Sequence, residues 1–269
     1  GAVCHKAFTI PDPEKRKTLI FEKPKGSRMP LAVNLLGTRK FMALALDTTI
    51  DRFHRDWIER AKNSIKPVIV EKGPCQENVM TGDQVDTSVI PVPIWNEKDG
   101  GPYITLPCWI TKDLETGWRN VGMYRCEVHD KNTVGIWADP HRHINMQWRK
   151  AHAKGKDFPV AIAIGPDPAV TIAAVARGGY GEDELNLAGA LRGKPVELVK
   201  CKTVPIEVPA TSEIVIEGWI KPGHLKHEGP YGEAYGYYGE SNEREYVEIT
   251  AITHRNNAIH QACYLHRTP

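Results

Sequence analysis

The 269-residue sequence has no long apolar run, no strong excess of charge of one sign and no clustered cysteines. Its longest apolar segments are far too short to cross a bilayer and no signal peptide begins the chain, so we expect no stable membrane insertion. The formal net charge is only +2, which gives no electrostatic footprint for nucleic acid. A chain of this length can bury an ample core, in one large domain or two smaller ones.

The six cysteines lie far apart, and none belongs to a CxxC pair. This pattern favours reduced thiols in a cytoplasmic protein and argues against a disulfide framework or a structural zinc. HExxH, nucleophile-elbow and kinase motifs are also missing. Residues 178–181, Gly-Gly-Tyr-Gly, look like a phosphate-binding loop, but no Lys-Ser/Thr follows and the strand–GxGxxG–helix context is absent. Zincins, Walker-type ATPases and Rossmann dehydrogenases are therefore excluded.

Hydrophobic periodicity changes near Lys66. Before it, helical spacing predicts two helices between Thr38 and Lys66, the first capped by Thr38 and the second entered near Thr48. Two strands precede them, at residues 19–21 and 31–36. Later helices are predicted at 144–153 and from 182 or 183 to Gly193. Further strands are predicted at residues 68–70, 89–92, 103–106, 121–137 (two strands joined around 130–132), 160–165, 196–199, 206–208, 213–218, 246–252 and 258–263. Many short strands with few helices indicate a β-barrel or sandwich for roughly residues 100–269.

Residues 227–238, His-Glu-Gly-Pro-Tyr-Gly-Glu-Ala-Tyr-Gly-Tyr-Tyr, combine two carboxylates with four tyrosines. Their glycines and Pro230 exclude a regular helix and favour turns that hold side chains at fixed angles. A carboxyl group beside a wall of aromatic rings has a raised pKa, as a proton donor near neutral pH requires. The stretch also fits a tyrosine-rich hairpin with two solvated glutamates, so distant residues must decide between the two interpretations.

Asn120, Arg125, His143 and Glu184 are polar residues of the β-rich part. The spacing of Asn120 and Arg125 puts them on opposite faces of an ideal strand, unless a bulge at Gly122 realigns them. An Asn oxygen, an imidazole and a carboxylate suit a hard divalent cation such as Mn²⁺ that bridges to a phosphate. Two alternatives stay open: His141 and His143 alternate as surface residues of a strand would, and Glu184 fits the first turn of a helix.

Short motifs occur in a consistent order along nearly the whole chain. They are Phe-Glu-Lys-Pro-Lys-Gly at 21–26, Asn-Leu-Leu-Gly-Thr at 34–38, Pro-Cys-Gln-Glu at 74–77, Asp-Gly-Gly-Pro-Tyr-Ile-Thr at 99–105, Asn-Val-Gly-Met-Tyr-Arg at 120–125, Gly-Pro-Asp-Pro at 165–168, the segment 184–193, and Glu-Gly-Pro-Tyr-Gly-Glu at 228–233. In this set and order, the sequence resembles the UbiD family of decarboxylases, which use prenylated flavin mononucleotide (prFMN). We therefore expect an α+β, mainly β fold: an N-terminal α/β portion over residues 1–100 and a split β-barrel that binds flavin over 101–269.

The resemblance also implies roles for individual residues. A Glu–Arg–Glu catalytic network is implied for Arg125, Glu228 and Glu233. The implied ligands of a divalent cation such as Mn²⁺, which holds the cofactor phosphate, are Asn120, His143 and Glu184. The positions that match contacts to the cofactor are Asn120, Met123, Tyr124, Arg125, Arg142 and His143. A K⁺ site is implied at Trp118, the backbone carbonyls of Ala173, Ala174 and Ala176, and Glu184. The choice between His143 and His141 as the metal ligand stays open.

By resemblance, the reaction is decarboxylation of an aromatic or α,β-unsaturated acid, with prFMN made by a flavin prenyltransferase. Glu228 is expected to pair with Arg125 and stay ionised. Glu233, between Tyr231 and Tyr235, is expected to favour its neutral form and to protonate the carbon that carbon dioxide leaves. The reverse carboxylation, a non-catalytic flavin-binding fragment or subunit, and more remotely a metal hydrolase without flavin are the alternatives.

The sequence departs from the family pattern at both ends. Family chains are longer, and the C-terminal domain that supplies subunit contacts and part of the substrate pocket is absent here. The last residues, Arg-Thr-Pro at 267–269, form no obvious terminating element. We therefore expect further sequence to follow and the full-length form to be a homo-oligomer.

Overall fold

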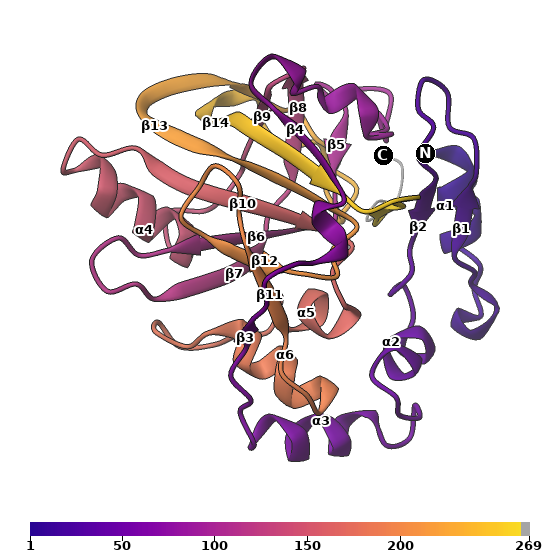
Figure 1. Ribbon diagram of the computed structural model, residues 1–269. Helices are drawn as coiled ribbons and strands as arrows, with labels where there is room; N and C mark the ends of the chain where they lie inside the picture. Colours follow the sequence, from indigo (N-terminus) through magenta and orange to yellow (C-terminus); the bar gives the residue numbers. More distant parts are fainter. Residues whose placement is uncertain (265–269) are drawn as a thin grey trace.

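The computed structural model describes residues 1–264, so the predicted open end at 267–269 lies outside the described part. Its largest element is a nine-stranded sheet in the order β5-β8-β9-β14-β13-β10-β6-β7, with β4 paired to β14 outside this path (Figure 1). The strands are β4 (Asn78–Thr81), β5 (Tyr103–Ile104), β6 (Pro107–Lys112), β7 (Arg119–Met123), β8 (Cys126–Asp130), β9 (Thr133–Gly135), β10 (Phe158–Ile164), β13 (Ile214–Glu228) and β14 (Asn242–His254). Every pairing in this sheet is antiparallel. The predicted α+β, mainly β fold is confirmed.

Strand β10 is buried on both faces, as its continuous apolar sequence predicts. Ile162 pairs with Trp109 of β6 and Ile216 of β13, and these three side chains belong to the same core cluster. Ala161 and Ala163 point to the opposite face, because side chains alternate along a strand. There they join a second core cluster with α5 (Pro168–Ala173) and α6 (Glu184–Arg192). The sheet therefore holds α5 and α6 against its outer face.

Strands β13 and β14 form one long hairpin that is extended well beyond the two short strands expected from the sequence. Its register shifts after Glu217, where a Cβ at Gly218 would lie 2.3 Å from the backbone oxygen of Glu248. A glycine is therefore needed for the two backbones to approach at this bulge. The hairpin ends at Glu228 and resumes at Asn242, so residues 229–241 form a loop at its tip.

The helices beside the sheet begin and end where the local sequence predicts. The carboxylate of Asp183 accepts a hydrogen bond from the Leu185 N–H (2.9 Å) and caps α6, and Gly193 ends α6 in a left-handed conformation at φ 77°. Helix α4 (His143–His152) corresponds to the helix expected at 144–153. The predicted cap of α2 (Arg39–Ala45) is also present, since the Thr38 hydroxyl accepts from the Phe41 N–H at 3.2 Å.

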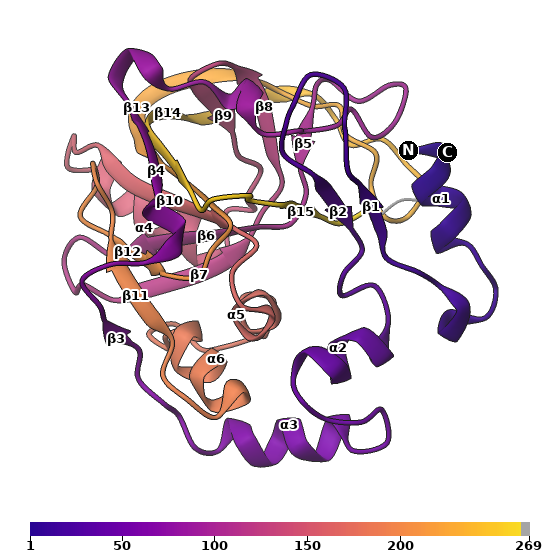
Figure 2. The ribbon, with the colours of Figure 1, turned by 45° about the vertical axis from the view of Figure 1, so that its right-hand side comes forward.

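The N-terminal part lies beside the large sheet and returns to it (Figure 2). Strands β1 (Leu19–Phe21), β2 (Leu31–Val33) and β15 (His260–Ala262) form a three-stranded sheet. Helices α2 and α3 (Phe53–Ala61) then lead to β3 (Val68–Ile69), which pairs in parallel with β11 (Glu197–Lys200) beside β12 (Glu207–Pro209). β3 and β4, which precede residue 100, pair with strands from the second half of the chain. The position of the domain boundary stays a prediction.

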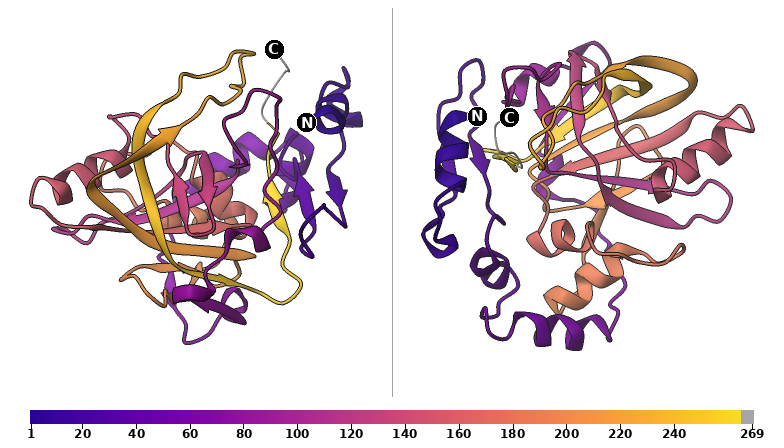
Figure 3. Two further views of the ribbon diagram at one scale, coloured as in Figure 1. Left: turned by 90° about the horizontal axis from the view of Figure 1, so that it is seen from above. Right: turned by 180° about the vertical axis from the view of Figure 1, so that it is seen from behind.

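Several local predictions were wrong: β4, β6 and α5 form in segments for which the sequence predicted no strand or helix. Helix α1 (Ala2–Phe8) forms in a segment for which the sequence predicted no element, and it lies at the opposite end of the molecule from α4 (Figure 3). Residues 89–92 form no strand: a 3₁₀ turn, Thr87–Val89, precedes prolines that have no N–H for a ladder. Helix α3 begins at Phe53 rather than near Thr48, because the Thr48 hydroxyl binds the Asp56 side chain instead of a backbone N–H.

The remaining short elements are the 3₁₀ turns Pro13–Lys15, Pro74–Gln76 and Gly82–Gln84. All six cysteines are free thiols. Among the described residues, no helix combines the length and the apolar composition that a membrane span requires.

Candidate functional site

Arg125 joins two glutamates that lie more than a hundred residues further along the chain. It lies in the connection between β7 and β8, and its guanidinium makes a two-pronged ion pair with Glu228 at the end of β13, with both N–O distances 2.8 Å. A third nitrogen, Nη1, contacts Oε1 of Glu233 in the hairpin loop. The side chain of Glu228 is only 1% exposed, whereas that of Glu233 is 44% exposed. The structure therefore brings the three residues of the predicted network together.

Burial by itself would lower the pKa of the Arg125 guanidinium. The hydrogen bonds from Arg125 to Glu228 and the charges of both glutamates outweigh that effect and raise the pKa. Arg125 is thus a permanent cation in a largely buried position. A buried cation requires paired carboxylates, and Glu228 supplies two oxygens in the planar geometry that a guanidinium prefers.

Three aromatic rings surround the Arg125 guanidinium. Its central carbon lies 5.0 Å from the ring centre of Tyr231, 5.2 Å from Trp137 and 5.9 Å from Tyr103. Such cation–π contacts exclude water from the pair and fix the arginine. The sequence analysis quoted Tyr103 within a motif but assigned it no role, and it missed Trp137. Neither shows a local signal that links it to Arg125.

The predicted aromatic wall beside Glu233 is not present. Tyr235 and Tyr237 are 90% and 73% exposed, and Tyr231 alone among the four tyrosines of the loop is buried. Glu233 itself faces Arg125. A glycine-rich loop tip lies outside the core, so its tyrosines reach solvent instead of enclosing the carboxylate.

Most of the other predicted site residues line one cavity of about 620 Å³. The predicted residues that line it are Asn120, Met123, Tyr124, Arg142, His143, Ala174, Ala176 and Glu184, together with His141. They come from β7, the start of α4, the segment after α5 and the start of α6. Arg142 and Arg177 bring positive charge to the cavity wall, as an anionic phosphate requires. By size and charge, the cavity fits a flavin nucleotide.

The geometry of β7 corrects the prediction that Asn120 and Arg125 lie on one strand and need a bulge at Gly122 to share a face. The β6–β7 register runs without a shift from Lys112–Arg119 to Cys108–Met123, so Gly122 is not a bulge. Instead β7 ends at Met123, and Arg125 lies in the connection to β8. Gly122 is needed for another reason: a Cβ there would lie 2.6 Å from the ring of Tyr124, which folds back over it. Burial raises the pKa of Tyr124 to about 12.

Asn120, His143 and Glu184 supply an amide, an imidazole and a carboxylate to this cavity. Glu184 accepts the Val121 N–H at 2.7 Å through one oxygen, and burial first, then the charges of Asp183 and Glu182, raise its pKa to about 7. Asn120 is buried, and its Nδ2 has no hydrogen-bond partner among the described residues. A buried carboxylate without a counter-charge fits a hard divalent cation, whereas the unsatisfied N–H donor of Asn120 fits an anionic acceptor such as a phosphate oxygen.

His143 is not a strand residue, as its alternation with His141 had suggested, but the first residue of α4. Burial and the charge of Arg142 lower the pKa of its ring, which favours the neutral form that binds metals. Within the described part of the chain, no group of three or more His, Cys, Asp and Glu side chains is arranged to hold a metal, and the candidate set has two such residues plus Asn120. Convergence of the three on one cation stays a prediction.

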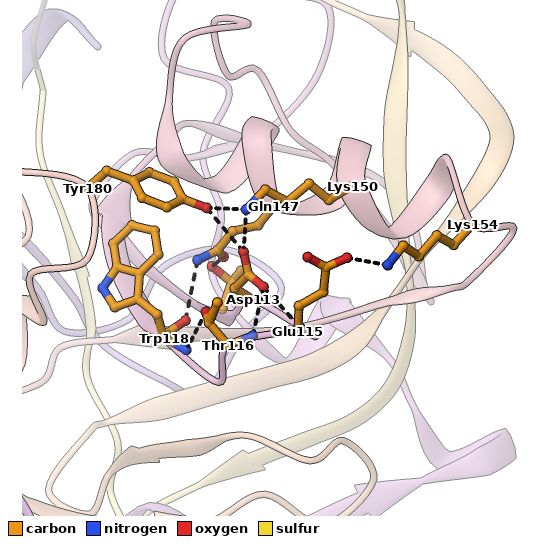
Figure 4. A network of polar contacts seen from close by, with 9 residues as sticks. Asp113, Glu115, Thr116, Trp118, Gln147, Lys150, Lys154 and Tyr180 are labelled. Atoms are coloured by element: carbon orange, nitrogen blue, oxygen red, sulfur yellow. Dashed lines mark hydrogen bonds and ion pairs between the residues drawn. The ribbon is translucent and has the colours of Figure 1, made fainter.

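Trp118, His143 and Tyr180 form a cluster of three rings beside the cavity. The ring centres lie 4.3 to 5.4 Å apart. Figure 4 shows the polar network behind them: the carboxylate of Asp113 accepts from Lys150 Nζ at 2.8 Å and from the Tyr180 hydroxyl at 3.1 Å. The sequence analysis missed Tyr180, Asp113 and Lys150. A lone tyrosine among the glycines of 178–181 was the available signal.

The predicted monovalent-cation site is only partly assembled around these rings. The indole N–H of Trp118 donates to the Glu182 carbonyl at 3.0 Å, and the Ala173 carbonyl accepts the Ala176 N–H at 3.0 Å. Ala174 and Ala176 line the cavity with Glu184. The K⁺ site stays a prediction.

Comparison with known proteins gives two family matches that together span nearly the whole chain. Residues 66–268 match the UbiD 3-octaprenyl-4-hydroxybenzoate carboxy-lyase Rift-related domain. Residues 2–61 match the N-terminal domain of the same carboxy-lyase. An uncharacterized protein of Archaeoglobus fulgidus is 35% identical over 274 residues, which cover 94% of this chain and 56% of that protein.

Two solved structures are similar over the described fold. Vanillic acid decarboxylase of Sedimentibacter hydroxybenzoicus, in its closed form, superposes with a TM-score of 0.94 at 34% identity, over 99% of this chain and 58% of that one. An evolved dimeric form of the UbiD-class enzyme HmfF from Pelotomaculum thermopropionicum, in complex with prFMN, superposes with a TM-score of 0.89 at 36% identity, over 94% and 59%. The chain thus spans a little over half the length of these relatives. It belongs to the UbiD family of carboxy-lyases, of which it carries the N-terminal and Rift-related domains.

Proposed function

We propose that this chain takes part in the reversible, non-oxidative decarboxylation of an aromatic or α,β-unsaturated carboxylic acid with prFMN. The observation that carries the proposal is the contact of Arg125 with both Glu228 and Glu233, one residue along the chain from the cavity wall at Tyr124. The prFMN bound by the HmfF relative supports the choice of cofactor. A flavin prenyltransferase supplies prFMN, and a homo-oligomer is the proposed form of the full-length protein.

Asn120, His143 and Glu184 would hold a divalent cation such as Mn²⁺ against the cofactor phosphate, with Arg142 and Arg177 adding charge. Met123 and Tyr124 would line the flavin, and a K⁺ ion would lie near Trp118 and the carbonyls of residues 173, 174 and 176. When bound, prFMN supplies the electron sink that decarboxylation of a conjugated acid needs. Bound at these residues, the metal ions would neutralise the charge of the cofactor phosphate and hold it in place.

The residues of the chain supply placement and the proton. Arg125 pairs with Glu228 and holds Glu233 within its reach. Glu233 is the more exposed of the two glutamates and delivers a proton to the carbon from which carbon dioxide has left. In the reverse direction the same carboxylate removes that proton.

Release of carbon dioxide tests this function. The full-length protein, purified from a host that makes prFMN, is offered cinnamate-like and hydroxybenzoate-like acids, and carbon dioxide is measured. Exchange of labelled carbon dioxide into the acid reports the reverse carboxylation. Bound flavin without either activity would instead support a non-catalytic flavin-binding subunit, which the partial coverage of the relatives makes the second candidate. Protein without a flavin absorbance spectrum would favour a metal hydrolase.

A further inference from the structure

The loop that carries Glu233 is fastened near its start by a buried carboxylate that the proposed reaction does not use. Glu127 of β8 is 6% exposed. Its Oε2 accepts the N–H of Gly229 at 2.8 Å and the hydroxyl of Tyr103 at 2.9 Å. Gly229 directly follows Glu228, so this bond fixes the backbone at the point where the chain leaves β13.

A second carboxylate fastens the same loop next to Glu233. Asp99 Oδ1 accepts the N–H of Gly232 at 2.9 Å, while its Oδ2 accepts the N–H of Asn96, also at 2.9 Å. Between these two anchors the Gly100 N–H donates to the Pro230 carbonyl at 2.7 Å. The segment from residue 99 to 103 is therefore bound to the segment from 229 to 232 by two direct hydrogen bonds, and Glu127 bridges the two segments by accepting from both Tyr103 and Gly229.

Gly100 and Gly101 allow the two segments to approach each other closely. A Cβ at Gly100 would lie 2.3 Å from the carbonyl oxygen of Gly229, and a Cβ at Gly101 would lie 2.9 Å from Oε1 of Glu127. Real Cβ atoms essentially never come this close to another atom, so a side chain at Gly100 would push the loop backbone away and one at Gly101 would displace the Glu127 carboxylate. The loop itself is a small hairpin, because Glu233 N–H donates to the Tyr237 carbonyl at 2.7 Å and Gly239 N–H to the Tyr231 carbonyl at 2.9 Å.

We propose that Glu127 and Asp99 are positioning residues that hold the two ends of the 228–233 segment, so that Glu228 and Glu233 both meet Arg125. The inference rests on the proposed function, since it concerns the geometry of that network. Glu127 fixes the Glu228 end through the Gly229 N–H, and Asp99 fixes the Glu233 end through the Gly232 N–H. Neither carboxylate touches the Arg125 guanidinium directly among the contacts of the described residues.

Two variants at each anchor separate hydrogen bonding from charge. Glu127→Ala and Asp99→Ala remove the acceptors. Glu127→Gln and Asp99→Asn keep a carbonyl oxygen that still accepts the loop N–H, but they remove the negative charge. Asp99→Asn also loses the acceptor for the Asn96 N–H, which lies outside the loop. Asp86→Ala is the matched control, because the Asp86 carboxylate also accepts a backbone N–H (Ser88, 2.8 Å), but this partner lies outside the 229–241 loop.

The first readout is amide hydrogen exchange of residues 229–239, measured by mass spectrometry on the cofactor-free chain. Losing the acceptor of a buried N–H costs about 1–3 kcal/mol, so exchange should accelerate about tenfold or more in both Ala variants. The amides of β10 serve as an internal reference and should keep the parent rate. In Glu127→Gln, Asp99→Asn and Asp86→Ala, the amides of residues 229–239 should exchange at the rate of the parent.

The second readout is turnover of the full-length protein at matched prFMN occupancy. The Ala variants should lose about tenfold or more in kcat with KM nearly unchanged, whereas Glu127→Gln and Asp99→Asn stay within about threefold of the parent. Parent-like loop exchange in the Ala variants, or equal acceleration in β10, would overturn the inference. So would Glu127→Gln falling as far as Glu127→Ala. A parent that releases no carbon dioxide contradicts the proposed function alone, because the exchange measurement still decides the inference.

Discussion

At the scale of single residues, Arg125 determines the character of the site. It is the shared partner of a carboxylate that is almost fully buried and of one that is nearly half exposed. The difference in exposure fits the proposed roles, in which Glu228 holds the arginine in place and Glu233 acts on the substrate. The two glutamates are therefore not interchangeable, although they carry the same chemical group.

The first prediction concerns the proton donor. Glu233→Gln keeps the shape of the side chain and removes the transferable proton, so turnover should fall by roughly a hundred- to ten-thousand-fold. Flavin and metal content should stay near those of the parent. The measurement is carbon dioxide release at matched cofactor occupancy. Glu240→Gln, an exposed glutamate of the same loop, is the control and should turn over normally. Equal turnover of Glu233→Gln and the parent would show that the proton comes from elsewhere.

The second prediction concerns Arg125→Ala. It should lower both flavin retention and rate, because Arg125 lies beside the cavity and holds the network. It should also lower the free energy of unfolding by about 3–5 kcal/mol, since it leaves the buried Glu228 without its counter-charge. Denaturant unfolding of the cofactor-free chain measures the loss. The double variant Arg125→Met/Glu228→Leu should recover most of the stability but no activity. A loss below about 1 kcal/mol would contradict the buried-pair account.

At the scale of elements, the cavity is built where one strand and two helix starts meet. Asn120 lies on β7, His143 begins α4 and Glu184 begins α6. The start of α4 has no side-chain cap, so its first backbone N–H groups and the positive end of its helix dipole suit a phosphate, whereas the start of α6 is capped by Asp183. Sequence spacing predicted both helices, and the antiparallel sheet brought their first residues to the same wall.

The third prediction follows from that arrangement. Glu184→Gln should lose the divalent cation and, with it, most of the bound flavin, because an amide is a weaker ligand than a carboxylate. Metal analysis and the flavin absorbance of the purified protein measure both. Treatment of the parent with a chelator should give the same flavin loss, whereas Glu197→Gln, an exposed strand residue, should change neither. Full flavin and metal content in Glu184→Gln would remove it from the ligand set.

The fourth prediction concerns β15. His260 is fully buried, its Nδ1 lies 2.9 Å from the Pro91 carbonyl, and burial lowers its pKa to about 4. Below the unfolded pKa of about 6.5, the unfolded chain binds a proton that the folded chain does not, so stability falls as pH drops from 6.5 toward 4, by about 3 kcal/mol from this residue. Denaturant unfolding across this range should show a steeper loss in the parent than in His260→Asn, which keeps a donor for Pro91. An equal loss of unfolding free energy with falling pH in the parent and in His260→Asn would contradict this contribution of His260.

At the scale of the whole molecule, the two ends of the chain are interlocked. The N-terminal β2 pairs with β15 near the C-terminus, β4 pairs with β14, and β3 pairs with β11. Val85 and Ile90, from the first hundred residues, belong to the core cluster inside the large sheet. The two family domains meet near residues 61–66. β3, β4, Val85 and Ile90 therefore belong to the Rift-related domain, and β2 belongs to the N-terminal domain.

The fifth prediction compares two truncations. A chain beginning at residue 62 keeps β3, β4 and the core residues Val85 and Ile90, while one beginning at 101 loses them. Removal of large buried side chains costs about 2–5 kcal/mol each, so the shorter chain should unfold at a clearly lower temperature or fail to fold. Far-UV circular dichroism during heating measures the difference. Equal melting temperatures would support the boundary at residue 100 that the periodicity suggested.

Local features were predictable because their causes are local. The cap at Asp183, the stop at Gly193 and the continuous apolar run of β10 each depend on residues a few positions apart. Errors arose where a distant contact or a missing N–H decided the outcome. The start of α3 depends on Thr48 turning to Asp56, and residues 89–92 form no strand because prolines interrupt the ladder.

The sequence by itself determined the chemistry available to this protein: which motifs are present, in which order, and which carboxylates, imidazole and guanidinium they carry. Local patterns in it could not determine which of these side chains touch, and the network of Arg125, Glu228 and Glu233 was expected from the family resemblance alone. Arg125 lies 103 residues from Glu228 and 108 from Glu233, and no spacing rule reaches that far. Only the tertiary structure decided that Glu233 faces Arg125 rather than tyrosines, and that Asp99 and Glu127 hold its loop. The physical reason is that these contacts depend on how the β13–β14 hairpin packs across the barrel, which is a property of the whole sheet.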